Sequence, residues 1–69
     1  MASRTTFSVR GMTCDHCVRA VETEVTAIPG VSGATADLAT GHLVVRSETP
    51  VDPAAVREAV AEAGYEVAA

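Results

Sequence analysis

The order in which hydrophobic periodicity changes along the chain limits the fold more than any other feature of this sequence. Apolar residues alternate with polar ones in four short stretches and recur at helical spacing in two longer ones. Phe7 and Val9 define the first alternating face, while Val21 and Val25 belong to the first helical stripe. The predicted elements, in chain order, are a strand at 5–10, a helix at 15–28, strands at 31–38 and 42–46, a helix at 53–63 and a strand at 65–67.

Turn and capping residues lie between these segments and support their boundaries. The Pro-Gly pair at 29–30 ends the first helix, and the Ala-Thr-Gly turn at 39–41 joins two strands into a hairpin. The Asp-Pro pair at 52–53 is a strong helix start, because Asp accepts at the N-cap and Pro fits the first helical position. Gly64 is a natural helix stop. The order β-α-β-β-α-β predicts an α+β, ferredoxin-like fold, with a four-stranded antiparallel sheet and two helices on one face.

Length and charge exclude several classes of function. The 69 residues allow one small domain, spanning 1–69. Five arginines and no lysine stand against nine acidic residues, giving a net charge of −4, so nucleic acid is not an expected partner. The start of the chain has no apolar secretory core, and no apolar run is long enough to cross a bilayer. We therefore expect a cytoplasmic location and no direct insertion into a membrane.

Both cysteines lie in one motif at the start of the first predicted helix. Cys14 is placed in the loop and Cys17 in the first helical turn. Free N–H groups and the helix dipole at this position favour the thiolate form, which is the form that binds metals. Two thiolates are a poor complete ligand set for Zn²⁺, which prefers four ligands, but they suit the soft ion Cu(I). An under-filled site on an exposed loop can also accept an incoming thiolate before it releases one of its own.

The motif and its surroundings resemble the heavy-metal-associated domain family, which includes copper chaperones and the N-terminal domains of copper-transporting P-type ATPases. The resemblance implies that Cys14 and Cys17 bind Cu(I) and pass it by docking to a partner ATPase. It further implies that Met12 points into the core and braces the loop, and that Tyr65 lies beside the metal, as in bacterial members. The residues that carry the resemblance are Gly11-Met12-Thr13-Cys14-Asp15-His16-Cys17-Val18, Ile28-Pro29-Gly30-Val31, Asp37-Leu38, Gly41 and Gly64-Tyr65.

His16 lies between the two cysteines and is a candidate additional ligand. Its imidazole could approach the metal, or it could be an exposed residue of the first helical turn. We expect a monomer without copper. Two open sites facing each other could share Cu(I), so a copper-bridged dimer with His16 near the seam is a further hypothesis.

The sequence predicts a cytosolic copper chaperone that is not an enzyme, and three alternatives stay open. The first is the excised N-terminal metal-binding domain of a copper ATPase, although the Met1 start and the end just after the last strand favour an independent protein. The second is a small thiol oxidoreductase, which the absence of Pro within the motif disfavours. The third is the handling of Zn²⁺, Cd²⁺ or Hg²⁺ at the same two cysteines.

Overall fold

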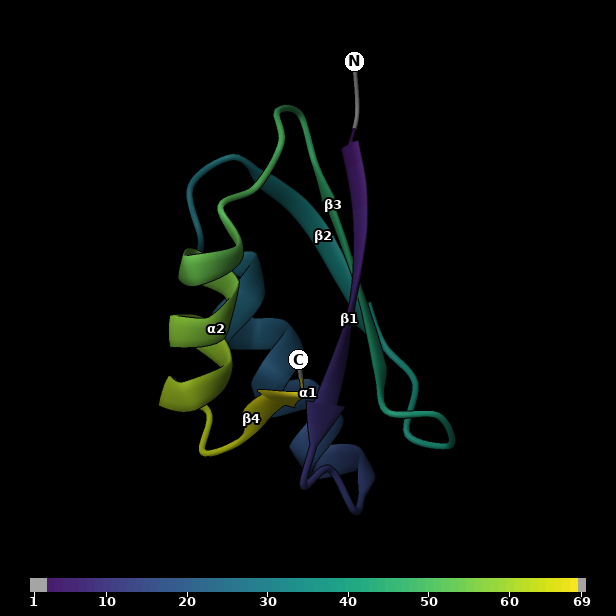
Figure 1. Cartoon of the computed structure of the whole chain (residues 1–69). Coiled ribbons are helices and arrows are strands. Elements are labelled where there is room, and N and C mark those ends of the chain that lie inside the picture. Colours follow the sequence, from purple (N-terminus) through teal and green to yellow (C-terminus); the bar gives the residue numbers. More distant parts are fainter. Residues whose placement is uncertain (1–2, 69) are drawn as a thin grey trace.

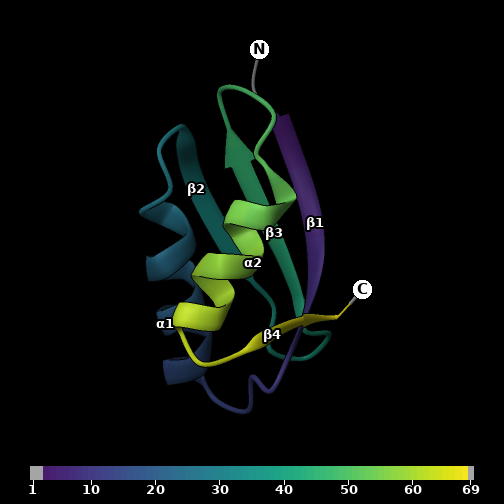
Figure 2. The same ribbon diagram turned by 60° about the vertical axis from the view of Figure 1, so that its left-hand side comes forward.

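The computed structural model describes residues 3–68 and has the ferredoxin-like β-α-β-β-α-β order that the sequence predicts. The strands form one antiparallel sheet in the spatial order β2-β3-β1-β4. Both helices lie on the same face of this sheet, and within the described residues no helix lies over the opposite face (Figures 1 and 2). The elements are β1 (Ser3–Arg10), α1 (Asp15–Thr26), β2 (Val31–Ala36), β3 (His42–Ser47), α2 (Pro53–Glu62) and β4 (Glu66–Ala68).

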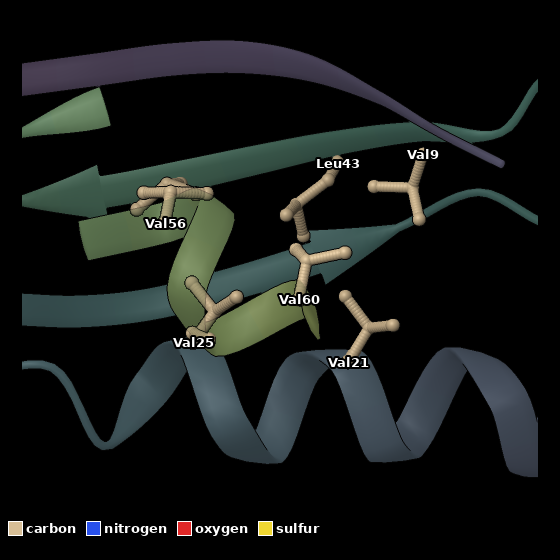
Figure 3. Packing of buried hydrophobic residues seen from close by; sticks show 8 residues of the cluster. Val9, Val21, Val25, Leu43, Val56 and Val60 are labelled. Atoms are coloured by element: carbon tan, nitrogen blue, oxygen red, sulfur yellow. The ribbon is translucent and has the colours of Figure 1, made fainter. Parts of the chain in front are cut away.

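The hydrophobic core lies between the helices and the inner face of the sheet and consists mainly of valine (Figure 3). Phe7 lies opposite Leu43 in the β1–β3 register, and Thr5 lies opposite Val45, so alternate residues of both strands face the helices. Burying a valine or leucine side chain contributes about 1.5–3 kcal/mol to folding, and the small side chains allow the helices to pack closely on the sheet. The core residues are Val9, Val21, Val25, Leu43, Val45, Val56, Ala59 and Val60.

Seven of the predicted boundaries differ from the structure by one or two residues, and three of them are one-residue differences at the ends of β3 (Ser47 instead of residue 46), α2 (Glu62 instead of residue 63) and β4 (Ala68 instead of residue 67). The first strand begins at Ser3 instead of residue 5, and α1 ends at Thr26 instead of residue 28. The second strand ends at Ala36 because the backbone of Asp37 closes the hairpin turn, donating to His42 (2.8 Å) and accepting from Gly41 (2.7 Å). Leu38, which the predicted strand included, therefore lies in the turn with 38% of its surface exposed.

The last strand begins at Glu66, one residue later than predicted. The turn that precedes it also positions Tyr65, a side chain of the candidate site. Gly64 has φ +92°, and its N–H bonds to the carbonyl of Ala61 (2.9 Å). The N–H of Tyr65 bonds back to the carbonyl of Val60 (3.0 Å). These two bonds form a Schellman motif, which needs a left-handed residue that glycine adopts without strain. The motif fixes Tyr65 at the end of α2, outside β4.

The connections of the molecule gather at two ends. The β1–α1 loop, the β2–β3 hairpin and the α2–β4 connection lie together at one end (Figures 1 and 2). The start of β1 and the β3–α2 connection lie at the other. Within residues 3–68, neither helix combines the length and apolar character required to cross a membrane.

Candidate metal centre

The β1–α1 loop brings the two cysteine sulfurs together in a reduced state. Cys14 is the N-cap residue of α1, with an extended backbone (φ −157°, ψ 171°). Its carbonyl accepts hydrogen bonds from the backbone N–H groups of Cys17 (3.1 Å) and Val18 (3.3 Å), which closes the first helical turn. The Sγ atoms of Cys14 and Cys17 are 3.3 Å apart, and both cysteines are free. A metal–thiolate bond is about 2.3 Å long, so both sulfurs can bind one ion.

The thiol of Cys17 has a pKa well below that of an ordinary cysteine. Its pKa is lowered from 9.0 to about 6, first by the Tyr65 hydroxyl, then by the backbone of Thr13 and by the Cys14 thiol, while desolvation acts in the opposite direction. The hydroxyl of Thr13 also lies 3.9 Å from the Cys17 sulfur. These donors stabilise the thiolate, which is the form that binds a soft metal. Cys17 therefore offers a thiolate near neutral pH.

Tyr65 reaches the loop because of its place after α2. Its hydrogen bond to Cys17 raises the pKa of the tyrosine hydroxyl, the counterpart of the lowered pKa of the thiol. Its ring lies against Gly11, where an added Cβ would approach the ring Cδ1 to 3.1 Å. Gly11 also has φ +95°, which side-chain-bearing residues rarely adopt. The need for glycine at position 11 was missed by sequence reasoning, which named Gly11 only as part of a motif.

The remaining predicted site residues take different positions around the thiols. Met12 is half-buried and packs against the hydrophobic core. His16 is exposed and, with Cys14, Asp15 and Arg19, lines a surface hollow of about 350 Å³. In the part of the chain that the structure describes, no three His, Cys, Asp or Glu side chains are grouped to hold a metal ion. The centre described here is therefore the cysteine pair, and His16 as a further ligand stays a prediction.

A ferredoxin-like fold with a C-x-x-C loop at a helix N-terminus defines a class of small metal-binding domains. The model of the heavy-metal-associated domain matches residues 6–66 of this chain. The chain belongs to this family.

Relatives of two kinds are similar to the chain. It is 46% identical over 61 residues to copper-transporting ATPase 2 of Rhizobium meliloti, covering 88% of this chain but 7% of the ATPase. It is 40% identical over 63 residues to the copper chaperone CopZ of Staphylococcus saprophyticus, covering 90% of this chain and 93% of CopZ. The chain thus spans a small part of the ATPase and nearly all of the chaperone.

A solved structure agrees with the fold. The N-terminal domain of a potential copper-translocating P-type ATPase from Bacillus subtilis, described in its Cu(I)-loaded state, matches with a TM-score of 0.86 and 28% identity. The match covers 97% of this chain and 85% of that domain.

Proposed function

We propose that this protein is a cytosolic Cu(I) chaperone, in which Cys14 and Cys17 bind the ion. The observation that carries the proposal is the sulfur pair, 3.3 Å apart on an exposed loop, with the pKa of one thiol lowered to about 6. Two soft ligands match the low coordination number that Cu(I) tolerates. The similarity to CopZ over nearly its full length and to a domain described in its Cu(I)-loaded state supports copper as the cargo.

Transfer proceeds by exchange of thiolates, with copper remaining Cu(I) throughout. Cys14 is exposed, whereas Cys17 is half-buried and hydrogen-bonded to Tyr65. An incoming thiolate of the partner adds to the ion, and the Cys14 sulfur leaves first because fewer contacts hold it. The Cys17 sulfur leaves after a second partner thiolate has bound. No electron is transferred, and each released thiolate can take a proton from water.

The partner in this proposal is the metal-binding domain of a copper-transporting P-type ATPase. Similarity of this chain to such ATPases supports a shared fold on both sides of the transfer. Residues 1–69 act as one heavy-metal-associated domain, monomeric without copper, and the protein is not an enzyme. A second candidate function is that of the N-terminal metal-binding domain of an ATPase, which the same features would suit. The similarity of the chain to both kinds of relative supports this candidate as well.

A transfer experiment tests the proposal. The reduced protein is loaded with one equivalent of Cu(I) and mixed with the apo metal-binding domain of a copper ATPase from the same genome, and the copper in each separated protein is measured. We expect copper to redistribute between the two proteins faster than it exchanges with a free chelator of equal affinity. Transfer no faster than exchange with the chelator would contradict a chaperone function. Reduction of insulin disulfides by the apo protein would favour the oxidoreductase alternative.

A further inference from the structure

The face of the sheet that points away from the helices carries positive charge. Val9 and Val45 are buried in the core, so Arg10 and Arg46, their neighbours in the strands, lie on the outer face together with Arg4. Among residues 3–68, no helix covers this face (Figure 1). The helices, in contrast, contain five of the nine acidic residues, namely Asp15, Glu22, Glu24, Glu58 and Glu62. A chain with a net charge of −4 therefore presents a cationic surface on one side.

Two of these arginines lie directly opposite each other. Arg4 of β1 and Arg46 of β3 are partners in the antiparallel register. Like charges in such a pair destabilise a sheet. On the same face, Glu66 lies opposite Arg10, at the other end of β1. Glu48 follows the end of β3 in the chain. An unfavourable pair without a compensating carboxylate opposite it is a feature that a bound anion would explain.

The side chain of Arg46 is held in place across the edge of the sheet. Its Nη1 donates to the Thr35 hydroxyl (3.1 Å), and its Nη2 lies where a side chain at Gly33 would be, 2.7 Å from an added Cβ. The register of β2 shifts between Val31 and Gly33, which places Ser32 in an irregular part of the strand. A guanidinium that is already ordered loses less entropy when it binds a ligand.

Arg4 and Arg46 line a surface groove of about 370 Å³ together with Ser3 and Ser32. We propose that this groove binds a phosphate-type oxyanion. Planar guanidinium groups donate paired hydrogen bonds to phosphate oxygens, and hydroxyl groups add further donors. Arg4 is six residues from the end of β1, about 20 Å along the strand, and the cysteine loop follows that end. The groove and the thiols are therefore separate sites, which can be tested independently.

Inorganic phosphate is the probe for a first experiment, with chloride at the same ionic strength as the control. Backbone resonances of the ¹⁵N-labelled, reduced apo protein are followed during the titration. We expect saturable shifts at residues 3–4, 32–35 and 46 with phosphate and not with chloride. Arg46→Gln should weaken binding at least about tenfold, because charge-assisted hydrogen bonds are lost. Arg57→Gln, which removes the same charge from α2, should bind phosphate like the wild type.

Gly33→Ala tests the geometry without changing the charge. The three atoms nearest to the added methyl group all belong to the flexible end of Arg46, so the fold can be retained while the guanidinium is displaced. We expect weaker phosphate binding and unchanged Cu(I) affinity. Equal shifts with phosphate and chloride, or unchanged phosphate binding in Arg46→Gln, would overturn the proposal.

A free phosphate and a lipid headgroup present the same oxygens to the groove. Sedimentation with phosphatidylcholine vesicles, with and without phosphatidic acid, separates the two sources. Binding that depends on phosphatidic acid and on Arg46 would assign the site to a headgroup. Phosphate shifts without vesicle binding would assign it to a soluble phosphate. Either result supports an oxyanion site.

Discussion

The two helices begin in different ways, although both start with a polar residue in an extended conformation. At α2, the Asp52 side chain accepts a hydrogen bond from the N–H of Ala54 (2.9 Å), and Pro53 occupies the first helical turn. At α1, Cys14 occupies the equivalent N-cap position, and its side chain makes no capping hydrogen bond. The first helix start lacks the stabilising contact that the second one has.

This difference indicates that the start of α2 has a structural role, whereas the start of α1 is available for metal binding. Substituting an Asp N-cap by Ala typically costs about 1 kcal/mol, which indicates how much stability α1 forgoes at Cys14. In exchange, the sulfurs of Cys14 and Cys17 lie at the positive end of the α1 dipole, where a thiolate or a thiolate-bound ion is stabilised. Substitutions at the start of α1 should therefore alter metal binding, and substitutions at the start of α2 should alter only the free energy of unfolding.

The largest effect is expected from Cys17→Ser. A serine hydroxyl is not a soft ligand, so one of the two metal bonds is lost, and we expect Cu(I) affinity to fall by at least about a thousandfold. Titration with Cu(I) in the presence of a competing chelator measures the loss. Asp52→Ala is the matched control, because it removes the N-cap side chain of the other helix. Wild-type affinity in Cys17→Ser would refute the two-thiolate centre.

The next effect concerns pH and the hydroxyl of Tyr65. In the wild type, the pKa of Cys17 is about 6 in the folded protein against 9.0 for an unperturbed thiol. Between about pH 6 and pH 9, the Cys17 thiol is therefore protonated in the unfolded chain but deprotonated in the folded protein. The stabilisation is complete above about pH 9, weakens as the pH falls, and is absent below about pH 6.

Tyr65→Phe removes the largest cause of this shift and should raise the pKa of Cys17. We expect alkylation of Cys17 at pH 6 to slow by up to about tenfold. The free energy of unfolding should then rise less steeply between pH 6 and pH 9 than in the wild type. Mass-resolved alkylation and urea unfolding of the reduced protein measure both quantities. Superimposable profiles of wild type and Tyr65→Phe would contradict this role of the hydroxyl.

Asp52→Ala should lower the free energy of unfolding by about 1 kcal/mol, with a range of about 0.5–2. The loss follows from removal of the Asp52 carboxylate, which accepts a hydrogen bond from the Ala54 N–H. Urea unfolding at neutral pH measures it. Asp52→Asn retains an acceptor and should recover most of the stability. A loss of Cu(I) affinity in Asp52→Ala would show that the two helix starts are not independent.

Cys14→Ser should change the free energy of unfolding in the opposite direction to Asp52→Ala, raising it by up to about 1 kcal/mol. Serine is a good N-cap residue, and Cys14 already has the extended backbone that the N-cap requires. The comparison is best made at pH 6 or below, where the Cys17 thiolate contributes little to stability. The same variant should lose tight Cu(I) binding. Stability equal to or below that of wild type would mean that the loop holds residue 14 away from the helix N–H groups.

The sequence predicted the fold because periodicity and capping agree along most of the chain. The inner face of β1 and the apolar stripe of α1 were predicted correctly, since alternation and helical spacing report burial directly. The end of β2 was not predicted, because the apolar Leu38 continues the alternation into the turn. The C-x-x-C motif identified the two cysteines as candidate metal ligands, but hydrophobic periodicity could not show that Gly11 leaves room for the Tyr65 ring. That contact joins residues more than fifty positions apart, and only the folded chain brings them together.

The smallest effect is expected at His16. The side chain is exposed and lines the same hollow as Cys14, while Cys17 is not among the residues that line it. Because no third ligand is grouped with the sulfurs within residues 3–68, we expect His16→Ala to change Cu(I) affinity by less than about tenfold at neutral pH. The informative measurement is the difference between wild type and variant from pH 6 to pH 8. A protonated imidazole cannot bind a metal, so a ligand role would make this difference grow as the pH rises, whereas an exposed residue of the first turn leaves the two curves parallel.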